Sequence, residues 1–143
     1  MTIKQISIFI ENKPVALAKL TGVLAENNIN LKALALADSS DFGIVRIIVD
    51  DADTVAKILT DHDYIVKTNG VIAAAISDEA GSLNHILTVM AENGRNVEYM
   101  YGFTGKKTNT ACMIIRCTDV PAAEKVLQDN NIRMISQNEI KDM

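Results

Sequence analysis

Several residue types are scarce in this chain of 143 residues, and each shortage excludes a class of protein. The chain has no tryptophan, two histidines and two cysteines, and its 14 basic residues are outnumbered by 18 acidic ones. A net charge of −4 argues against a nucleic-acid-binding protein, which normally carries a basic stripe. No apolar run approaches the ~20 residues that cross a bilayer, and the N-terminus lacks the layout of a signal peptide. We therefore expect a cytoplasmic protein.

The few cysteines and histidines also bear on metal and redox chemistry. Cys112 and Cys117 have an odd spacing within one expected strand, so their side chains point to opposite faces and cannot pair or share a metal ion. We expect two buried thiols, with His62 at a helix end and His85 exposed. The C-x-x-C loop of metal-carrying ferredoxin-like domains is absent. We therefore expect no metal and no cofactor.

Catalytic patterns are equally scarce. Acyl-phosphate hydrolysis on a small α+β domain would need a phosphate-cradling loop with an arginine after the first strand, and the chain has none there. No Ser/His/Asp or Cys/His set is evident. The sequence therefore predicts a protein that is not an enzyme.

What the chain does contain is an internal repeat. Leu17, Leu20 and Leu24 match Leu83, Ile86 and Met90 at an offset of 66 residues, and Asp51 matches Asp119 at an offset of 68. The two extra residues fall between the second and third strands, in the region of residues 38–43 of the first half and 104–109 of the second. This period is too long for a solenoid repeat. It predicts two tandem small domains, residues 1–69 and 70–143, with a boundary near residues 68–70.

Both halves show the same order of elements. The first has alternating strands at 6–10, 30–37 and 44–49, a helix that Pro14 opens and residues 27–28 close, a helix at 51–62 and a closing strand at 64–67. The second has strands at 71–76, 97–103, 110–117 and 132–135, a helix from Leu83 to residues 93–94, and a helix that Asp119 caps. The order βαββαβ is the ferredoxin-like plan, so we expect an α+β fold with two antiparallel sheets, each covered by two helices on one face.

The strands carry apolar residues at both odd and even positions, and this pattern is relevant to oligomerisation. Val45 and Ile47 alternate with Ile44 and Ile48, whereas a half-exposed sheet would show polar residues at alternate positions. We expect the face away from the helices to be covered, by a partner subunit that packs sheet against sheet in a homodimer. The alternative is an ordinary apolar surface.

The loop SDEAGSL, residues 77–83, joins the first strand and first helix of the second half. The first N–H groups of a helix lack intrahelical partners and attract a carboxylate, and Gly81 removes a side chain that would block its approach. Asp78 and Ser82 offer oxygens for an ammonium group. One loop could thus hold both ends of an α-amino acid. In the structural alternative, Asp78 caps the helix, Gly81 relieves a turn and Ser82 is solvated.

This loop in its setting resembles the ACT domain, whose pattern is D-x-[PA]-G-x-L followed by a turn and an asparagine. The second half shows it as Asp78 to Leu83 and then Asn96-Val97, and the first half as the weaker 12–17 and then Asn30-Leu31. In the first half Asn12 replaces Asp, Lys13 adds a positive charge, and Val15 replaces Gly. The two loops are therefore not equivalent, and one site per chain is as plausible as two.

The resemblance implies a regulatory protein that binds a free amino acid between ACT units and modulates a partner enzyme or regulator. It implies ligand-binding roles for Asp78, Ala80, Gly81, Ser82, Leu83, Asn96, Asn12, Lys13, Pro14, Ala16, Leu17 and Asn30. The two asparagines after the helices are expected to brace their loops or to touch ligand. Leu34 and Leu36, or Tyr99 and Tyr101, are candidates for side-chain selectivity. The alternative is a module for dimerisation or interaction that binds no small ligand.

Overall fold

The structure is a computed structural model that describes residues 2–104 and 110–143. The chain divides into two compact units, and each is described by itself. The first unit is Lys4–Asn69, and the second is Gly70–Met143 together with Thr2 and Ile3. The sequence pattern instead groups the first residues with the first half.

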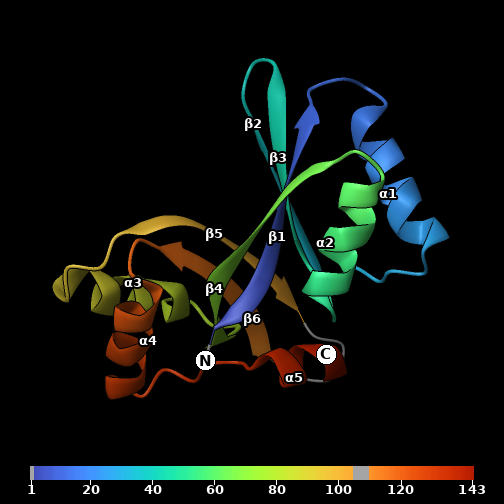
Figure 1. The fold of residues 1–143 in the computed structure, drawn as a ribbon. Helices are drawn as coiled ribbons and strands as arrows, with labels where there is room; N and C mark the ends of the chain where they lie inside the picture. Colours follow the sequence, from blue (N-terminus) through green and yellow to red (C-terminus); the bar gives the residue numbers. More distant parts are fainter. Residues whose placement is uncertain (1, 105–109) are drawn as a thin grey trace. The chain divides into compact units, whose positions relative to one another are not determined.

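The first unit has the order βαββαβ (Figure 1). Its elements are β1 (Ile3–Glu11), α1 (Ala16–Glu26), β2 (Ala33–Asp38), β3 (Phe42–Ile48), α2 (Ala52–Asp61) and the beginning of β4 (Ile65–Ser77). The strands lie in the order β2-β3-β1-β4, and β3 pairs antiparallel with both β1 and β2. Pro14 lies in the turn before α1 rather than at its first residue, because the helix begins at Ala16.

The alternation in β1 decides which face is covered by the helices. Ile6, Ile8 and Ile10 pack with Leu20 and Leu24 of α1 in one buried core. The helix ends as expected, with Asn27 at its C-cap and Asn28 in the left-handed region at φ 55°. Burial of one apolar stripe on α1 against one parity of β1 therefore builds the helical layer of this unit.

The second unit repeats the plan. The second part of β4 is followed by α3 (Ser82–Glu92), β5 (Val97–Thr104), β6 (Thr110–Cys117) and α4 (Val120–Asp129). The strands lie in the order β4-β6-β5, and β6 pairs antiparallel with both neighbours. The expected closing strand at 132–135 is reduced to one bridge between Ala74 and Met134, with Ala75 N–H donating to Arg133 O and Ile135 N–H to Ala73 O. The ferredoxin-like fold class is thus observed in both units.

The segment around Asn69-Gly70 is not a break between strands. The sequence predicts one strand at 64–67 and another at 71–76, but β4 is a single strand of 13 residues. Neither Asn69 nor Gly70 has a positive φ, and the Gly70 carbonyl accepts a hydrogen bond of 2.8 Å from Arg116 Nη1. The dipeptide suggests a turn, yet here it stays extended because β6 holds it from the side.

One helix was missed by the sequence interpretation. α5 (Gln137–Asp142) begins with a capping box in which Ser136 Oγ accepts from Glu139 N–H and the Glu139 carboxylate accepts from Ser136 N–H. The spacing S-x-x-E is a known start signal that could have revealed it. The expected two-residue insertion at 104–109 lies outside the described residues, apart from Thr104.

The strand registers show which residues lie on the sheet face away from the helices. They are Gln5, Ser7 and Ile48 in the first unit and Ala73 and Ile114 in the second. The sheet-face homodimer stays a prediction.

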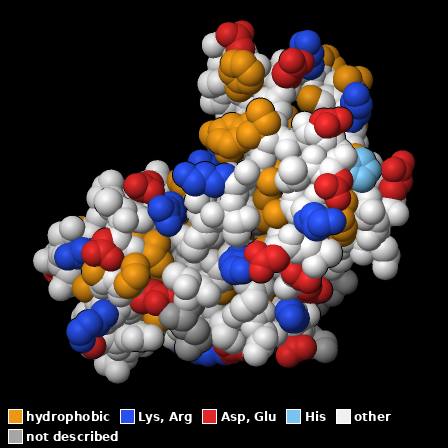
Figure 2. All heavy atoms as spheres, in the orientation of Figure 1, with side chains coloured by type: hydrophobic (Ala, Val, Ile, Leu, Met, Phe, Trp, Pro, Cys, Tyr) orange, Lys and Arg blue, Asp and Glu red, His pale blue; other side chains and the backbone are white. Residues whose placement is uncertain are grey.

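Some apolar side chains reach the surface. Leu34 and Leu36 of β2 are 40% and 51% exposed, and Phe42 at the start of β3 is 59% exposed. Figure 2 shows hydrophobic side chains at the surface along this β2–β3 hairpin, at the top of the view.

Candidate functional site

The loop between β4 and α3 leaves the start of the helix open. Gly81 is the N-cap residue of α3 and adopts the left-handed conformation with φ +92°. A Cβ atom at this position would meet nothing within 4 Å. The missing side chain therefore leaves space above the first N–H groups of α3, and the backbone conformation itself favours glycine.

The helices differ in how they begin, and the difference is informative. Asp51 accepts a hydrogen bond from Thr54 N–H at the start of α2, and Asp119 accepts one from Ala122 N–H at the start of α4. The capping role expected for Asp119 is thus confirmed. No side chain caps α1 or α3, the two helices that follow the first strand of each repeat. Ser82 N–H donates to Glu79 O at 3.2 Å and Ala16 N–H to Lys13 O at 3.1 Å, so the next N–H groups of each helix and its partial positive charge are available to a ligand.

The side chains of the second loop differ in the contacts that they make within the chain. Asp78 is exposed and forms no hydrogen bond or ion pair with another described residue, so the alternative in which it caps α3 is not observed. Ser82 Oγ lies 2.7 Å from Ser77 Oγ, and Ser77 Oγ donates to Glu79 Oε2 at 3.4 Å. Ala80 is exposed and Leu83 half-buried. The loop therefore brings together the unpaired Asp78 carboxylate, the Ser82 hydroxyl that contacts Ser77, and the start of α3, which no side chain caps.

The side chains of the first loop form more hydrogen bonds and ion pairs within the chain. Asn12 donates from Nδ2 to Ser39 O at 3.3 Å, and its N–H donates to Asp41 O. Lys13 Nζ forms a 2.7 Å ion pair with Glu11, which lowers the pKa of Glu11 and raises the pKa of Lys13. Val15 is the N-cap residue of α1 and is 64% exposed. Pro14 is exposed, and Ala16 and Leu17 are half-buried.

The two asparagines after the helices lie away from these loops within their own units. Asn96 follows α3, which has 11 residues and hence a length of about 16 Å, so it lies at the other end of the helix from Gly81. Asn30 has the same relation to Val15 across α1. Both are exposed, and neither side chain hydrogen-bonds to another described residue. The bracing role expected for them is not observed.

The strand registers settle where the selectivity candidates point. Leu34 and Leu36 lie opposite Ile47 and Val45, so they share the helix-covered face of the first unit. Tyr99 and Tyr101 lie opposite Arg116 and Ile114, on the face away from the helices. A register shift between Val97 and Tyr99 accompanies this placement.

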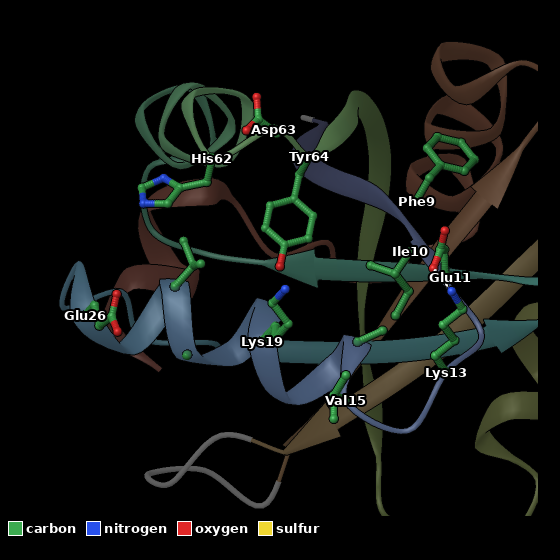
Figure 3. A pocket seen from close by; sticks show the side chains of 13 residues that line it. Phe9, Ile10, Glu11, Lys13, Val15, Lys19, Glu26, His62, Asp63 and Tyr64 are labelled. Atoms are coloured by element: carbon green, nitrogen blue, oxygen red, sulfur yellow. Dashed lines mark ion pairs between the residues drawn. The ribbon is translucent and has the colours of Figure 1, made fainter.

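A cavity of about 800 Å³ lies in the first unit (Figure 3). It is bordered by the end of β1, one face of α1 and the turn that follows α2. Lys13 and Ala16 are its only members from the expected ligand-binding set. Sequence reasoning missed Lys19, Glu26 and Tyr64, although Gly22 in the interior of a helix was a signal that could have drawn attention to this face.

The cysteines and histidines lie where the sequence predicts. Cys112 and Cys117 are both free and buried on opposite faces of β6, and burial raises the pKa of Cys112 to about 12. His62 caps the end of α2 with its Nδ1 2.8 Å from Ile58 O, and His85 is exposed. Within 2–104 and 110–143, no group of three or more His, Cys, Asp or Glu side chains could hold a metal ion. Over the same residues, no helix is both long enough and apolar enough to span a membrane.

The chain is similar to known proteins in sequence and in structure. The chain matches the model of the ACT domain pair over residues 1–143. Protein BT0572 from Bacteroides thetaiotaomicron is 35% identical, covers 100% of this chain and 98% of its own, and superimposes with a TM-score of 0.92. No curated protein sequence matches.

More distant solved structures share the fold. The regulatory subunit of aspartate kinase from Thermus thermophilus is 16% identical, with a TM-score of 0.60 over 88% of this chain and 91% of that one. Its counterpart from Thermus flavus is 18% identical, with a TM-score of 0.58 over 88% and 90%. The repeat, the βαββαβ order of both units and the match over the whole length lead to one conclusion: the chain belongs to the ACT domain pair family.

Proposed function

We propose that this chain is a non-catalytic, cytoplasmic regulatory protein that binds a free amino acid and thereby modulates a partner enzyme or regulator. The observation that carries the proposal is the start of α3, where Gly81 is left-handed, a Cβ would meet nothing, and no side chain caps the helix. The name of the Thermus thermophilus protein gives it a regulatory role, and its fold is shared with this chain.

Each group at this helix start has a chemical task in the proposal. The ligand carboxylate accepts hydrogen bonds from the N–H groups that follow that of Ser82 at the start of α3, where the helix dipole favours negative charge. The ligand ammonium donates to the Asp78 carboxylate and to the hydroxyl of Ser82, which Ser77 holds in place. Binding would alter the affinity for the partner, and by linkage the partner would alter the affinity for the amino acid.

The first loop is a weaker candidate for the same chemistry. Val15 occupies the position that Gly81 has in the second loop. Asn12 is hydrogen-bonded to the loop between β2 and β3, and Lys13 forms an ion pair with Glu11. We therefore propose one principal amino-acid site per chain, at the second loop.

The test is a thermal-melt screen of the full chain against the twenty amino acids at millimolar concentration. A ligand at 100 times its dissociation constant stabilises the folded state by about 2.7 kcal/mol, a shift of several degrees for a domain of this size. One amino acid should give such a shift, and Gly81→Val or Asp78→Ala should abolish it.

Gly94→Val is the matched control. Gly94 also has a positive φ, +66°, and a Cβ there would also meet nothing within 4 Å, so valine imposes comparable backbone strain at the far end of α3. This variant should melt lower than wild type yet keep the ligand response. If the folded wild type responds to none of the twenty, the alternative of a ligand-free interaction module is the better description.

A further inference from the structure

The cavity of the first unit is lined by charged and polar side chains that form no hydrogen bond or ion pair with other described residues. Lys19 and Glu26 on α1 and the Tyr64 hydroxyl make no side-chain hydrogen bond or ion pair with another described residue. In Figure 3 the Tyr64 hydroxyl points toward the Lys19 ammonium, and Glu26 lies farther along α1 below His62. Burial raises the pKa of Tyr64, so its hydroxyl stays protonated and can donate.

The charges are arranged along the helix axis. Lys19 and Glu26 are seven residues apart, which places them on the same face of α1 at a separation of about 10 Å between their backbone positions. Asp63 also lines the cavity but lies beside Tyr64, away from Glu26 (Figure 3). One region of the cavity therefore offers the Lys19 ammonium and the Tyr64 hydroxyl, and the other offers the Glu26 carboxylate. The apolar side chains of Ile10, Ala16 and Val23 also line the cavity.

Gly22 lies between Lys19 and Glu26 on α1, and the packing of the helix does not require glycine at this position. It is in the interior of α1, its φ is not positive, and an added Cβ would meet nothing within 4 Å. Glycine in the interior of a helix destabilises the helix relative to alanine. What its missing side chain provides is room in the cavity wall between Lys19 and Glu26.

The second repeat shows that the fold does not require the Tyr64 phenol or the Lys19 ammonium, whereas Glu26 is repeated as Glu92. At the offsets of the repeat, His85 corresponds to Lys19, Thr88 to Gly22, and Ile132 to Tyr64. Ile132 is 8% exposed and packs in the core of its unit. A hydrocarbon side chain thus completes the same plan, so the phenol and the ammonium are specific to the cavity.

We propose that this cavity binds an elongated zwitterion, a small molecule whose carboxylate and ammonium groups are separated by several methylene groups. The carboxylate is bound by the Lys19 ammonium and the Tyr64 hydroxyl, the ligand ammonium by the Glu26 carboxylate, and the methylene groups lie against the apolar lining. The site is distinct from the Gly81 loop and does not depend on the function proposed for that loop.

The experiment uses 6-aminohexanoate as the probe in a titration of the ¹⁵N-labelled full chain followed by amide chemical shifts. Hexanoate and hexylamine each carry one of the two charged groups and serve as comparison probes. The probe should shift amides of α1 and of residues 62–64 in a saturable way, and both comparison probes should bind at least about tenfold more weakly, because each lacks one charge-assisted contact. Absence of saturable shifts, or equal binding of hexanoate, would overturn the proposal.

Variants distinguish probe binding in this cavity from a nonspecific effect of surface charge. Lys19→Gln and Glu26→Gln should each weaken probe binding about tenfold, whereas Lys57→Gln, which removes an exposed lysine of α2 outside the cavity, should leave it unchanged. Gly22→Ala should raise the melting temperature and weaken probe binding, a combination that a purely structural glycine does not produce. Gly81→Val should leave probe binding intact, so the two sites succeed or fail independently.

Discussion

At the level of single residues, the two cysteines of β6 have the most altered chemistry. Cys112 and Cys117 are both buried, and burial raises the pKa of each thiol, that of Cys112 to about 12. The thiolate is the reactive form of cysteine. Both side chains therefore act as small apolar groups in the folded protein.

This burial has a measurable consequence. At pH 8 the folded chain should not react with a thiol reagent such as DTNB, whereas the chain unfolded in guanidinium should release two equivalents of the chromophore. Because the folded pKa of Cys112 lies above the unfolded value of about 8.5, its contribution to stability is fully present below that pH and is lost as the pH rises toward 12. Fast reaction of the folded chain would contradict the assignment.

At the level of elements, the helices fall into capped and uncapped groups. α2 and α4 begin with aspartates that accept backbone hydrogen bonds, and α1 and α3 begin without a side-chain cap. An aspartate near a helix start in the sequence can therefore serve stability or remain available to a ligand. Asp119 and Asp78 represent these two roles within one unit.

Removing each carboxylate should separate the two roles. Asp119→Ala removes the hydrogen bond to Ala122 N–H and should lower the free energy of unfolding by about 1 kcal/mol in urea denaturation. Asp78→Ala removes no hydrogen bond and should change it by less than about 0.5 kcal/mol, while abolishing the response to the amino acid. A large loss of stability in Asp78→Ala would show that this carboxylate has a structural role.

The elements also show how far sequence reasoning extends. Period-2 alternation and the 3.6-residue stripe located β1, α1 and β6 because each buries one face in a local core. The course of β4 through Asn69-Gly70 was not predictable, because a hydrogen bond from Arg116, 46 residues away, keeps it extended. The loop at Gly81 was found because its φ and its position follow from residue type. The cavity along α1 was not, because Lys19 and Tyr64 are adjacent only after folding.

At the level of the whole molecule, a sheet-face homodimer remains testable. Phe9 lies opposite Ile44, on the face away from the helices, and is 42% exposed. If two copies meet there, the wild type should sediment at about twice the 15.6 kDa of one chain, and Phe9→Lys should sediment as a monomer.

Leu36→Lys is the control for this experiment. Leu36 is 51% exposed but lies on the helix-covered face, so lysine there should leave a sheet-face dimer intact. Dissociation by Leu36→Lys alone would place the contact at the β2 edge instead. A wild type that sediments as a single chain would contradict the homodimer altogether.

The unbroken course of β4 limits how the chain could change in length. Successive side chains of a strand point to opposite faces, so one residue inserted after Asn69 would exchange the buried and outward positions of every later residue in β4. Ile72 and Ala74 would leave the helical core, and Ala73 would enter it. Two inserted residues would restore the original parity. Natural variation in length at this point should therefore be even-numbered or absent.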